Sequence, residues 1–315
     1  MQSTQGTYEG AGQTPIFIRE FVPDGEPVGV IQLLHGMGEH SARYIPLCEK
    51  LTEAGFAVSA PDHRGHGETG KAHAADGSGM LTHYADEDGW SKVVEDQILL
   101  LGRLRARHPG RPVVLLGHSM GSYIGRALAI RAGHQLDGLV LSGSMGNAPL
   151  FFKVTRAIAS FEAWRLGPRS PSPLIQRLSF DSFARSIPDR GTEFDWLSRD
   201  PAEVQAYIDD PLCGFACTTS LWRDMLGGLV QINTVAQVAS MPPDLPIYIM
   251  SGEHDPVHEK LKGIRAMEKL FSQAGMQQVT SRVFPDGRHE MFNETNRDEV
   301  IEALLAWLAP RVERS

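Results

Sequence analysis

The sequence lacks several features that would assign it to a particular class of protein. Only three of its 315 residues are cysteine, Cys48, Cys213 and Cys217, which are too few for a disulfide framework, and we interpret all three as small buried apolar residues. No apolar run approaches the roughly 18 residues that cross a bilayer. The first residues carry neither the basic nor the apolar region of a secretion signal. A globular, cytoplasmic protein is therefore expected.

Positive charge is also scarce. Lys and Arg number 30 against 38 Asp and Glu, so the formal net charge is -8. Because nucleic acids are bound through a basic field, no nucleic-acid partner is expected. His63 with His66 and His254 with His258 form close pairs, but both pairs fall in loops and have no evident third ligand. We therefore predict neither a metal site nor a cofactor.

What the chain has instead is an alternation of short apolar strands with helices. Strands are predicted over 16–22, 28–34, 56–60, 112–116, 139–142, 246–251 and 279–284, and helices over 44–54, 90–108, 123–132, 261–274 and 299–308. Continuous apolar strands separated by helices are typical of a parallel sheet covered on both faces. No helix separates the first two strands, which predicts an antiparallel edge.

The segment 147–245 interrupts this alternation. It contains no convincing strand, prolines divide its helical pieces, and it holds 11 of the 24 aromatic residues. A helical insertion that acts as a lid would account for these features. We therefore expect an α/β core of residues 1–146 and 246–315 and a helical cap of residues 147–245. In the alternative interpretation, the aromatic residues only form a small core within the insertion.

The strongest chemical signal is a G-x-S-x-G match centred on Ser119, in Gly117-His118-Ser119-Met120-Gly121. It follows an apolar strand and precedes a helix, which is the setting of a nucleophile elbow. Only glycine fits beside so sharp a turn, and the amides of the next helix would face any negative charge that develops at the serine. Ser119 is therefore the candidate nucleophile. The alternative is an ordinary turn flanked by glycines.

A serine hydroxyl needs a base that removes its proton. In folds with this elbow, the chain order is nucleophile, acid, histidine. That order selects His289, in the loop after the last strand, and Asp255, in the loop after the preceding strand. Both loops are expected at the same edge of the sheet as Ser119. Glu253 and Asp286 are competing carboxylates, and Asp255 is favoured.

A second glycine-rich turn follows an early strand, in His35-Gly36-Met37-Gly38. Such a turn can direct a backbone N–H into an oxyanion hole. We predict that the amides of Met37 and Met120 form this hole. The alternative is a plain glycine turn.

Together these motifs resemble the α/β-hydrolase serine hydrolases of the monoacylglycerol lipase and lysophospholipase type, whose domain is often labelled serine aminopeptidase. The resemblance extends from about residue 16 to 308, and one departure is Thr69, where relatives usually carry Ser. It is carried by residues 35–44 (HGMGEHSARY), 62–67 (DHRGHG), 117–121, 252–257 and 287–294.

The resemblance implies a mostly parallel eight-stranded sheet with helices on both faces and a helical cap. It also implies a triad of Ser119, Asp255 and His289, and an oxyanion hole of the Met37 and Met120 amides. In monoacylglycerol lipases, the residues that match Glu39, Arg43 and His118 lie near the glycerol end of the substrate. Surface or supporting roles for Glu39 and Arg43 are the alternative.

These observations predict a cofactor-free serine hydrolase that cleaves a small acyl ester or a monoacyl lipid through an acyl-enzyme. An aminopeptidase or amidase, an acyltransferase with the same triad, and a non-catalytic ligand-binding protein of the same fold are the alternatives. The aromatic stretch from Pro149 to Trp164 predicts contact with a membrane or micelle surface. A helix packed on the core is the alternative for that stretch.

Overall fold

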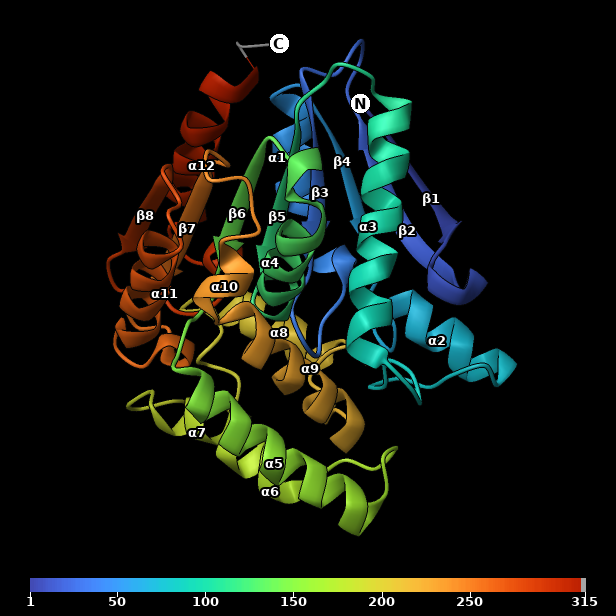
Figure 1. The fold of residues 1–315 in the computed structure, drawn as a ribbon, viewed down its shortest axis with the longest axis vertical. Helices are drawn as coiled ribbons and strands as arrows, with labels where there is room; N and C mark the ends of the chain where they lie inside the picture. The colour runs from blue at the N-terminus through green and yellow to red at the C-terminus, as the bar shows by residue number, and fades with distance from the viewer. Residues whose placement is uncertain (313–315) are drawn as a thin grey trace.

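The computed structural model describes residues 1–312 and places eight strands in one sheet (Figure 1). In spatial order the strands are β1 (Gln2–Glu9), β2 (Pro15–Val22), β4 (Phe56–Pro61), β3 (Gly29–Leu34), β5 (Val113–His118), β6 (Gly138–Ser142), β7 (Ile247–Gly252) and β8 (Val279–Phe284). Strand β2 runs antiparallel to both of its neighbours, and every pairing from β4 to β8 is parallel. The mostly parallel sheet with an antiparallel edge is confirmed.

Strand β1 is an element that the sequence pattern does not reveal. Its residues are exposed except Tyr8, so it shows neither an apolar run nor an alternation of buried and exposed residues. It forms because it pairs with β2 along its whole length, from Gln2 opposite Val22 to Glu9 opposite Pro15. Long-range pairing, which local composition does not encode, therefore adds the edge strand.

Helices cover both faces of the sheet. On one face lie α3 (Gly89–Arg107), α4 (Met120–Ala132) and α11 (Lys262–Gln273), and on the other lie α1 (Ile45–Glu53) and α12 (Arg297–Val312). Neighbouring residues of one strand therefore face opposite layers of helices. Val30 and Leu115 pack in the first layer, whereas Ile31 and Leu116 pack in the second. Strands that are buried on both sides need continuous apolar sequence, which explains the runs in the chain.

Between β6 and β7 the described chain is helical, and its helices lie beyond the carboxyl ends of the strands (Figure 1). They are α5 (Pro149–Leu166), α6 (Pro173–Leu178), α7 (Phe180–Arg185), α8 (Pro201–Asp209), α9 (Thr219–Ile232) and α10 (Val235–Val238). Helix α9 packs on the core helices α3 and α4, and α5 lies along α9. We call residues 147–245 the cap. Its boundaries stay a prediction, and residues 313–315 of the expected core lie outside the described residues.

The cysteines differ in their burial. Cys48 and Cys217 are buried, but Cys213 is only partly buried, so the interpretation of all three as buried apolar residues is wrong for Cys213. Its backbone N–H donates to the carbonyl of Asp210, in the turn that follows α8. The residue is partly exposed because this turn lies where the cap meets the core.

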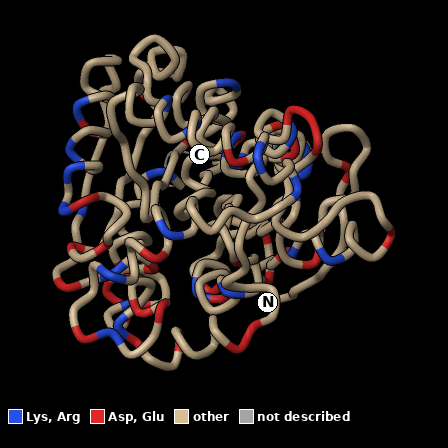
Figure 2. Tube along the Cα trace, turned by 90° about the horizontal axis from the view of Figure 1, so that it is seen from below, with Lys and Arg blue, Asp and Glu red and all other residues tan. Residues whose placement is uncertain are grey.

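Two surface properties bear on possible partners. Within residues 1–312, no helix is both long and apolar enough to cross a membrane. Basic and acidic residues are interspersed along the trace (Figure 2).

Candidate active site

Ser119 occupies a strained turn between β5 and α4. Its φ of 50° and ψ of -119° are unusual for a residue with a side chain, and such strain of about 1–3 kcal/mol is concentrated at functional sites. A Cβ on Gly117 would lie 2.4 Å from the carbonyl oxygen of Gly121, and a Cβ on Gly121 would lie 2.2 Å from that of Leu34. Both flanking positions therefore require glycine, and Ser119 reaches the wall of the main cavity.

His289 and Asp255 form a buried pair on the same cavity wall. The Nδ1 atom of His289 lies 2.9 Å from Oδ2 of Asp255, and their side chains are 3% and 0% exposed. Asp255 is fixed further by the backbone N–H of Val257, which donates to Oδ1 at 2.9 Å. Glu253 and Asp286 are exposed instead, and among residues 1–312 only Asp255 offers its carboxylate to His289.

The environment favours charge on both members of this pair. Burial alone would lower the pKa of His289, but the charge of Asp255 and the hydrogen bond to it raise the pKa above its usual value. Burial likewise opposes the charge on Asp255, yet His289 holds the pKa of Asp255 below its usual value. Asp255 would therefore stabilise a positive charge on the His289 ring.

Met37 and Met120, whose amides are predicted to form the oxyanion hole, line the cavity together with Ser119. Among the backbone hydrogen bonds of the described turns and loops, neither N–H group donates to another protein group. The loop that carries Met37 is braced internally, since the Gly36 N–H donates to Oε1 of Glu39 at 2.5 Å. Residues of the cap also hold this loop.

The carbonyl of Gly38, directly after Met37, accepts two hydrogen bonds from the cap. The Tyr207 hydroxyl donates at 2.8 Å and the Gly214 N–H donates at 2.9 Å. Sequence reasoning missed both donors because they lie about 170 residues further along the chain. Cap and oxyanion loop are therefore coupled by direct polar contacts.

A buried cluster of two carboxylates and one guanidinium supports the site. Arg43 bonds both carboxylate oxygens of Glu290, one of them at 2.8 Å, and lies 3.2 Å from Glu39. Burial opposes the charge on Glu290, but Arg43 lowers the pKa of Glu290 to about 2. Burial and the charge of Glu290 raise the pKa of Glu39. Glu290 is a residue that the sequence analysis missed, although it directly follows His289.

The three residues predicted to bind the alcohol end of the substrate lie in different places. Glu39 and His118 line the cavity with Ser119. Arg43 does not line it and forms an ion pair with Glu290. Burial, reinforced by the charge of His289, lowers the pKa of His118 to about 3, so its ring is neutral at physiological pH. The ring lies 4.7 Å from that of His289. Direct contact of these residues with substrate stays a prediction.

The histidine-rich motif at residues 62–67 buttresses the oxyanion loop. The backbone N–H of His63 donates to Nε2 of His35 at 3.0 Å, and the two rings pack at a tilt with their centroids 4.2 Å apart. Burial lowers the pKa of His63 to about 3 and that of His66 to about 4. These rings are therefore neutral and act as packed hydrogen-bonding groups in the loop.

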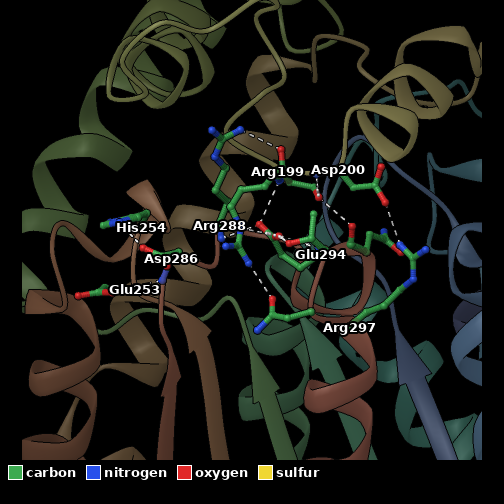
Figure 3. A network of polar contacts seen from close by, with 12 residues as sticks. Arg199, Asp200, Glu253, His254, Asp286, Arg288, Glu294 and Arg297 are labelled. Carbon is green, nitrogen blue, oxygen red and sulfur yellow. Dashed lines mark hydrogen bonds and ion pairs between the residues drawn. The ribbon is translucent and has the colours of Figure 1, made fainter.

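A polar network binds the loop of His289 to the cap (Figure 3). Arg288 donates to the backbone carbonyl of Ser198 at 2.9 Å, and Glu294 lies 2.9 Å from Nε of Arg199. Arg297 lies 3.1 Å from Asp200. The paired residues of this network are about 90 positions apart in the sequence. The sequence pattern therefore did not predict that they would pair.

The cavity above these residues has a volume of about 800 Å³. Small-molecule sites typically range from about 300 to 1,000 Å³. The core loops contribute Ser119 and His289 to its lining. The cap contributes mainly apolar side chains, those of Phe151, Phe152, Ile158, Ile175, Phe180, Phe183, Trp196, Trp222, Met225, Leu226 and Leu229.

The sheet order, the Ser119 turn and the buried His289–Asp255 pair together define an α/β-hydrolase with a serine-type site. A model of the hydrolase family described as serine aminopeptidase, S33, matches residues 25–296, and the chain belongs to this family. The resemblance seen in the motifs is thus confirmed.

Individual relatives cover nearly the whole chain. The monoacylglycerol lipase of Mycolicibacterium smegmatis is 29% identical over 97% of this chain and 96% of its own length. The human monoglyceride lipase is 28% identical over 89% of this chain and 85% of its own. A thermostable carboxyl esterase from Bacillus coagulans, solved in complex with glycerol, superimposes with a TM-score of 0.88 at 28% identity over 99% of both chains. The chain is accordingly an ester hydrolase.

Proposed function

We propose that the protein hydrolyses monoacylglycerols or similar monoacyl esters, with Ser119 as nucleophile, His289 as general base and Asp255 as the carboxylate that orients it. The observation that carries this proposal is the 2.9 Å His289–Asp255 hydrogen bond, buried at the floor of a cavity that also presents Ser119. The names of the relatives support the substrate class. The apolar cap wall supports an acyl chain as one part of the substrate.

The proposed reaction has two steps that share the same groups. The Ser119 oxygen attacks the ester carbonyl while His289 takes the hydroxyl proton, and the Met37 and Met120 amides stabilise the oxyanion. His289 then gives this proton to the leaving alcohol, and an acyl-enzyme remains. Water, deprotonated by His289, attacks the acyl-enzyme and releases the fatty acid. An alcohol in place of water would give acyl transfer, so both reactions share one intermediate.

The cavity separates the two parts of such a substrate. The acyl chain would lie among the apolar cap side chains, because burying each methylene contributes about 0.8 kcal/mol. The glycerol part would lie at the polar end, beside Glu39 and His118. Arg43 would act from behind this end by holding Glu39 and Glu290 in place. This arrangement assigns a supporting role to Arg43.

The same cluster argues against the aminopeptidase alternative. A peptide ammonium group needs a carboxylate with unsatisfied charge. Glu290 is held by both nitrogens of Arg43, and the Glu39 carboxylate already accepts from Gly36, Arg43 and Tyr44. The polar end therefore suits hydroxyl groups better than a cation.

Replacing Ser119 by alanine tests the triad. We expect hydrolysis to fall by about 10⁴-fold or more, because the nucleophile is lost while the oxyanion hole remains. A fluorophosphonate probe should label the wild type and Ser182→Ala, which removes another cavity serine, but not Ser119→Ala. Substantial activity in folded Ser119→Ala would contradict the triad. Failure of the probe to label the wild type would favour a non-catalytic binding protein.

A substrate series tests the second part of the proposal. Monoacylglycerols with acyl chains of medium to long length should be turned over faster than amino-acid naphthylamides. kcat/KM should also rise with chain length until the apolar wall is filled. The reverse ranking of glycerides and amides would support the aminopeptidase alternative.

We also propose that the outer surface of α5 contacts lipid. Leu150, Val154, Phe161 and Trp164 are exposed there, and Trp164 is 80% exposed. Exposed apolar clusters of this kind mark interaction surfaces, and Trp is favoured at lipid interfaces. Trp164→Ala should reduce sedimentation with phosphatidylcholine vesicles severalfold, whereas Leu99→Ala, at an exposed leucine of α3, should not. Equal losses in both variants would contradict a specific contact.

A further inference from the structure

Three metal-ligating side chains meet where the cap turn touches the core. His40 follows the oxyanion loop, while Asp210 and Cys213 belong to the turn after α8. One potential ligand atom from each residue lies within 4.8 Å of the other two. The sequence analysis found no partner for Cys213, because His40 is 170 residues or more away in the chain.

His40 is oriented as a metal-binding histidine would be. Its Nε2 lies 2.8 Å from Oδ2 of Asp210, and the residue is 5% exposed. Its other ring nitrogen, Nδ1, is buried and has no hydrogen-bond partner among the described residues. Metal-binding histidines usually give one ring N–H to a carboxylate and use the other nitrogen as the ligand. A buried nitrogen without a partner is otherwise costly.

The turn after α8 presents Asp210 and Cys213 together. The other Asp210 oxygen, Oδ1, accepts the N–H of Leu212 at 2.8 Å, and the Cys213 N–H donates to the Asp210 carbonyl at 3.0 Å. These bonds fix the turn without using the Cys213 sulfur. Burial raises the pKa of the Cys213 thiol, so a bound cation would have to displace its proton.

We propose that His40, Asp210 and Cys213 form a binding site for one thiophilic divalent cation of the Zn²⁺ type. Imidazole and thiolate are protein ligands that Zn²⁺ takes, and water would complete four-coordination. Partial exposure of Asp210 and Cys213 gives the ion a way in from solvent. In this arrangement His40 and Cys213 bind the ion, and Asp210 accepts the Nε2–H of His40 and orients its ring.

The position of this site predicts an effect on turnover, a part of the inference that rests on the proposed function. His40 lies two residues after Gly38, whose carbonyl is held by Tyr207 and Gly214 on either side of the metal-binding turn. A bound ion would add a coordinate link between cap and core. Because substrates enter and products leave beneath such caps, this link should slow turnover.

Binding is tested on the full-length protein after treatment with a chelator. Calorimetric titration should show one equivalent of Zn²⁺, and Co²⁺ should give a thiolate-to-metal charge-transfer band. Cys213→Ser should remove the band and weaken Zn²⁺ binding at least tenfold, and His40→Ala should weaken it similarly. Cys217→Ser, four residues away and buried, is the matched control and should leave both signals unchanged.

A second control addresses the exposed group of Glu253, His254 and Asp286, which also places three possible ligands together. His254→Ala should leave the tight Zn²⁺ equivalent unchanged. Loss of that equivalent in His254→Ala, or its survival in both Cys213→Ser and His40→Ala, would overturn the proposal. If Cys213→Ser does not fold, as judged by circular dichroism without metal, Asp210→Asn provides the same comparison.

The activity measurement is kept separate from binding. Zn²⁺ at saturating concentration should reduce kcat on a soluble short-chain ester at least twofold in the wild type, and not in Cys213→Ser. Unchanged kcat despite one bound equivalent would overturn the coupling to the cap and leave the site itself established. Because binding is measured without turnover, failure of the ester-hydrolase assignment would not affect the binding result.

Discussion

Two parts of the cap, which we call its inner half and its outer half, are attached to the molecule in different ways. The inner half, residues 194–214, is bonded to the core loops: the carbonyls of Trp196 and Leu197 accept the backbone N–H groups of His289 and Glu290, at 3.3 and 2.8 Å. Tyr207 reaches the oxyanion loop. In the outer half, helices α5 to α7, α5 packs along α9, and α6 contacts α7. Phe180 and Phe183 of α7 pack on Trp196 of the inner half. Large apolar side chains are exposed on α5 and α6.

This difference matches the demands of the two ends of the cavity. Catalytic groups must be held within fractions of an ångström, and directional hydrogen bonds and ion pairs do this well. An acyl chain is bound by non-directional apolar contact, which tolerates movement. The inner half is therefore bonded to the loops that carry the proposed catalytic residues, although it lies within the predicted cap.

The largest effect is expected from breaking the inner attachment at Glu294. Its carboxylate is fully buried and accepts the backbone N–H groups of Arg288 and Arg199 as well as the Arg199 side chain. Glu294→Gln should lower the free energy of unfolding by about 3 kcal/mol, because it leaves the partly buried guanidinium of Arg199 without its counter-charge and disturbs the buried bonds to two backbone N–H groups. Urea denaturation measures this. Glu299→Gln, at an exposed pair with Arg282, should cost less than about 1 kcal/mol, and equal losses would contradict the comparison.

The next effect concerns pH and the charges around His289. The base must be neutral to accept a proton, so kcat/KM should fall about tenfold per pH unit as pH drops below the raised pKa of His289. Glu290, held by the inner half, is one of the charges that raise this pKa. Glu290→Gln should therefore move the acid limb to lower pH, whereas Glu302→Gln, at an exposed position of α12, should not. A wild-type limb below the usual histidine pKa of about 6.5 would contradict the assignment.

A smaller effect is expected at Tyr207, where one of the two cap bonds to Gly38 can be removed. A hydrogen bond contributes about 1 kcal/mol, so Tyr207→Phe should lower kcat about fivefold with KM for a short soluble ester little changed. Tyr248→Phe removes a hydroxyl from the sheet core, where the ring stacks 5.5 Å from Trp307, and serves as the control. If both variants keep full kcat, the cap does not position the oxyanion loop.

The smallest effect is expected in the outer half. Trp164→Ala should change the free energy of unfolding by less than about 0.5 kcal/mol, because an exposed side chain loses little on truncation. Its kcat/KM on a short soluble ester should also stay at the wild-type value. A large loss of either would show that the outer half is as firmly built into the molecule as the inner half.

Much of the site could be predicted because its chemistry is local in sequence. The glycines beside Ser119 are demanded by close backbone contacts within one turn, and the loops after β7 and β8 must reach the same edge of a parallel sheet. Chain order then selects Asp255 and His289. The predicted core strands agree with the structure to within a few residues for the same reason, since burial on both faces leaves an apolar run.

Other features depend on contacts between distant residues. Edge strand β1 needs its partner β2, and the Arg43–Glu290 pair joins residues 247 positions apart. The exposure of Cys213 and its meeting with His40 follow from the way the cap turn is placed on the core. Thus the sequence alone determined the fold class, the nucleophile turn and the candidate triad, because short-range sterics and burial patterns encode them. Only the tertiary structure decided which charges pair and which half of the cap is fixed, because those depend on where separate segments meet in space.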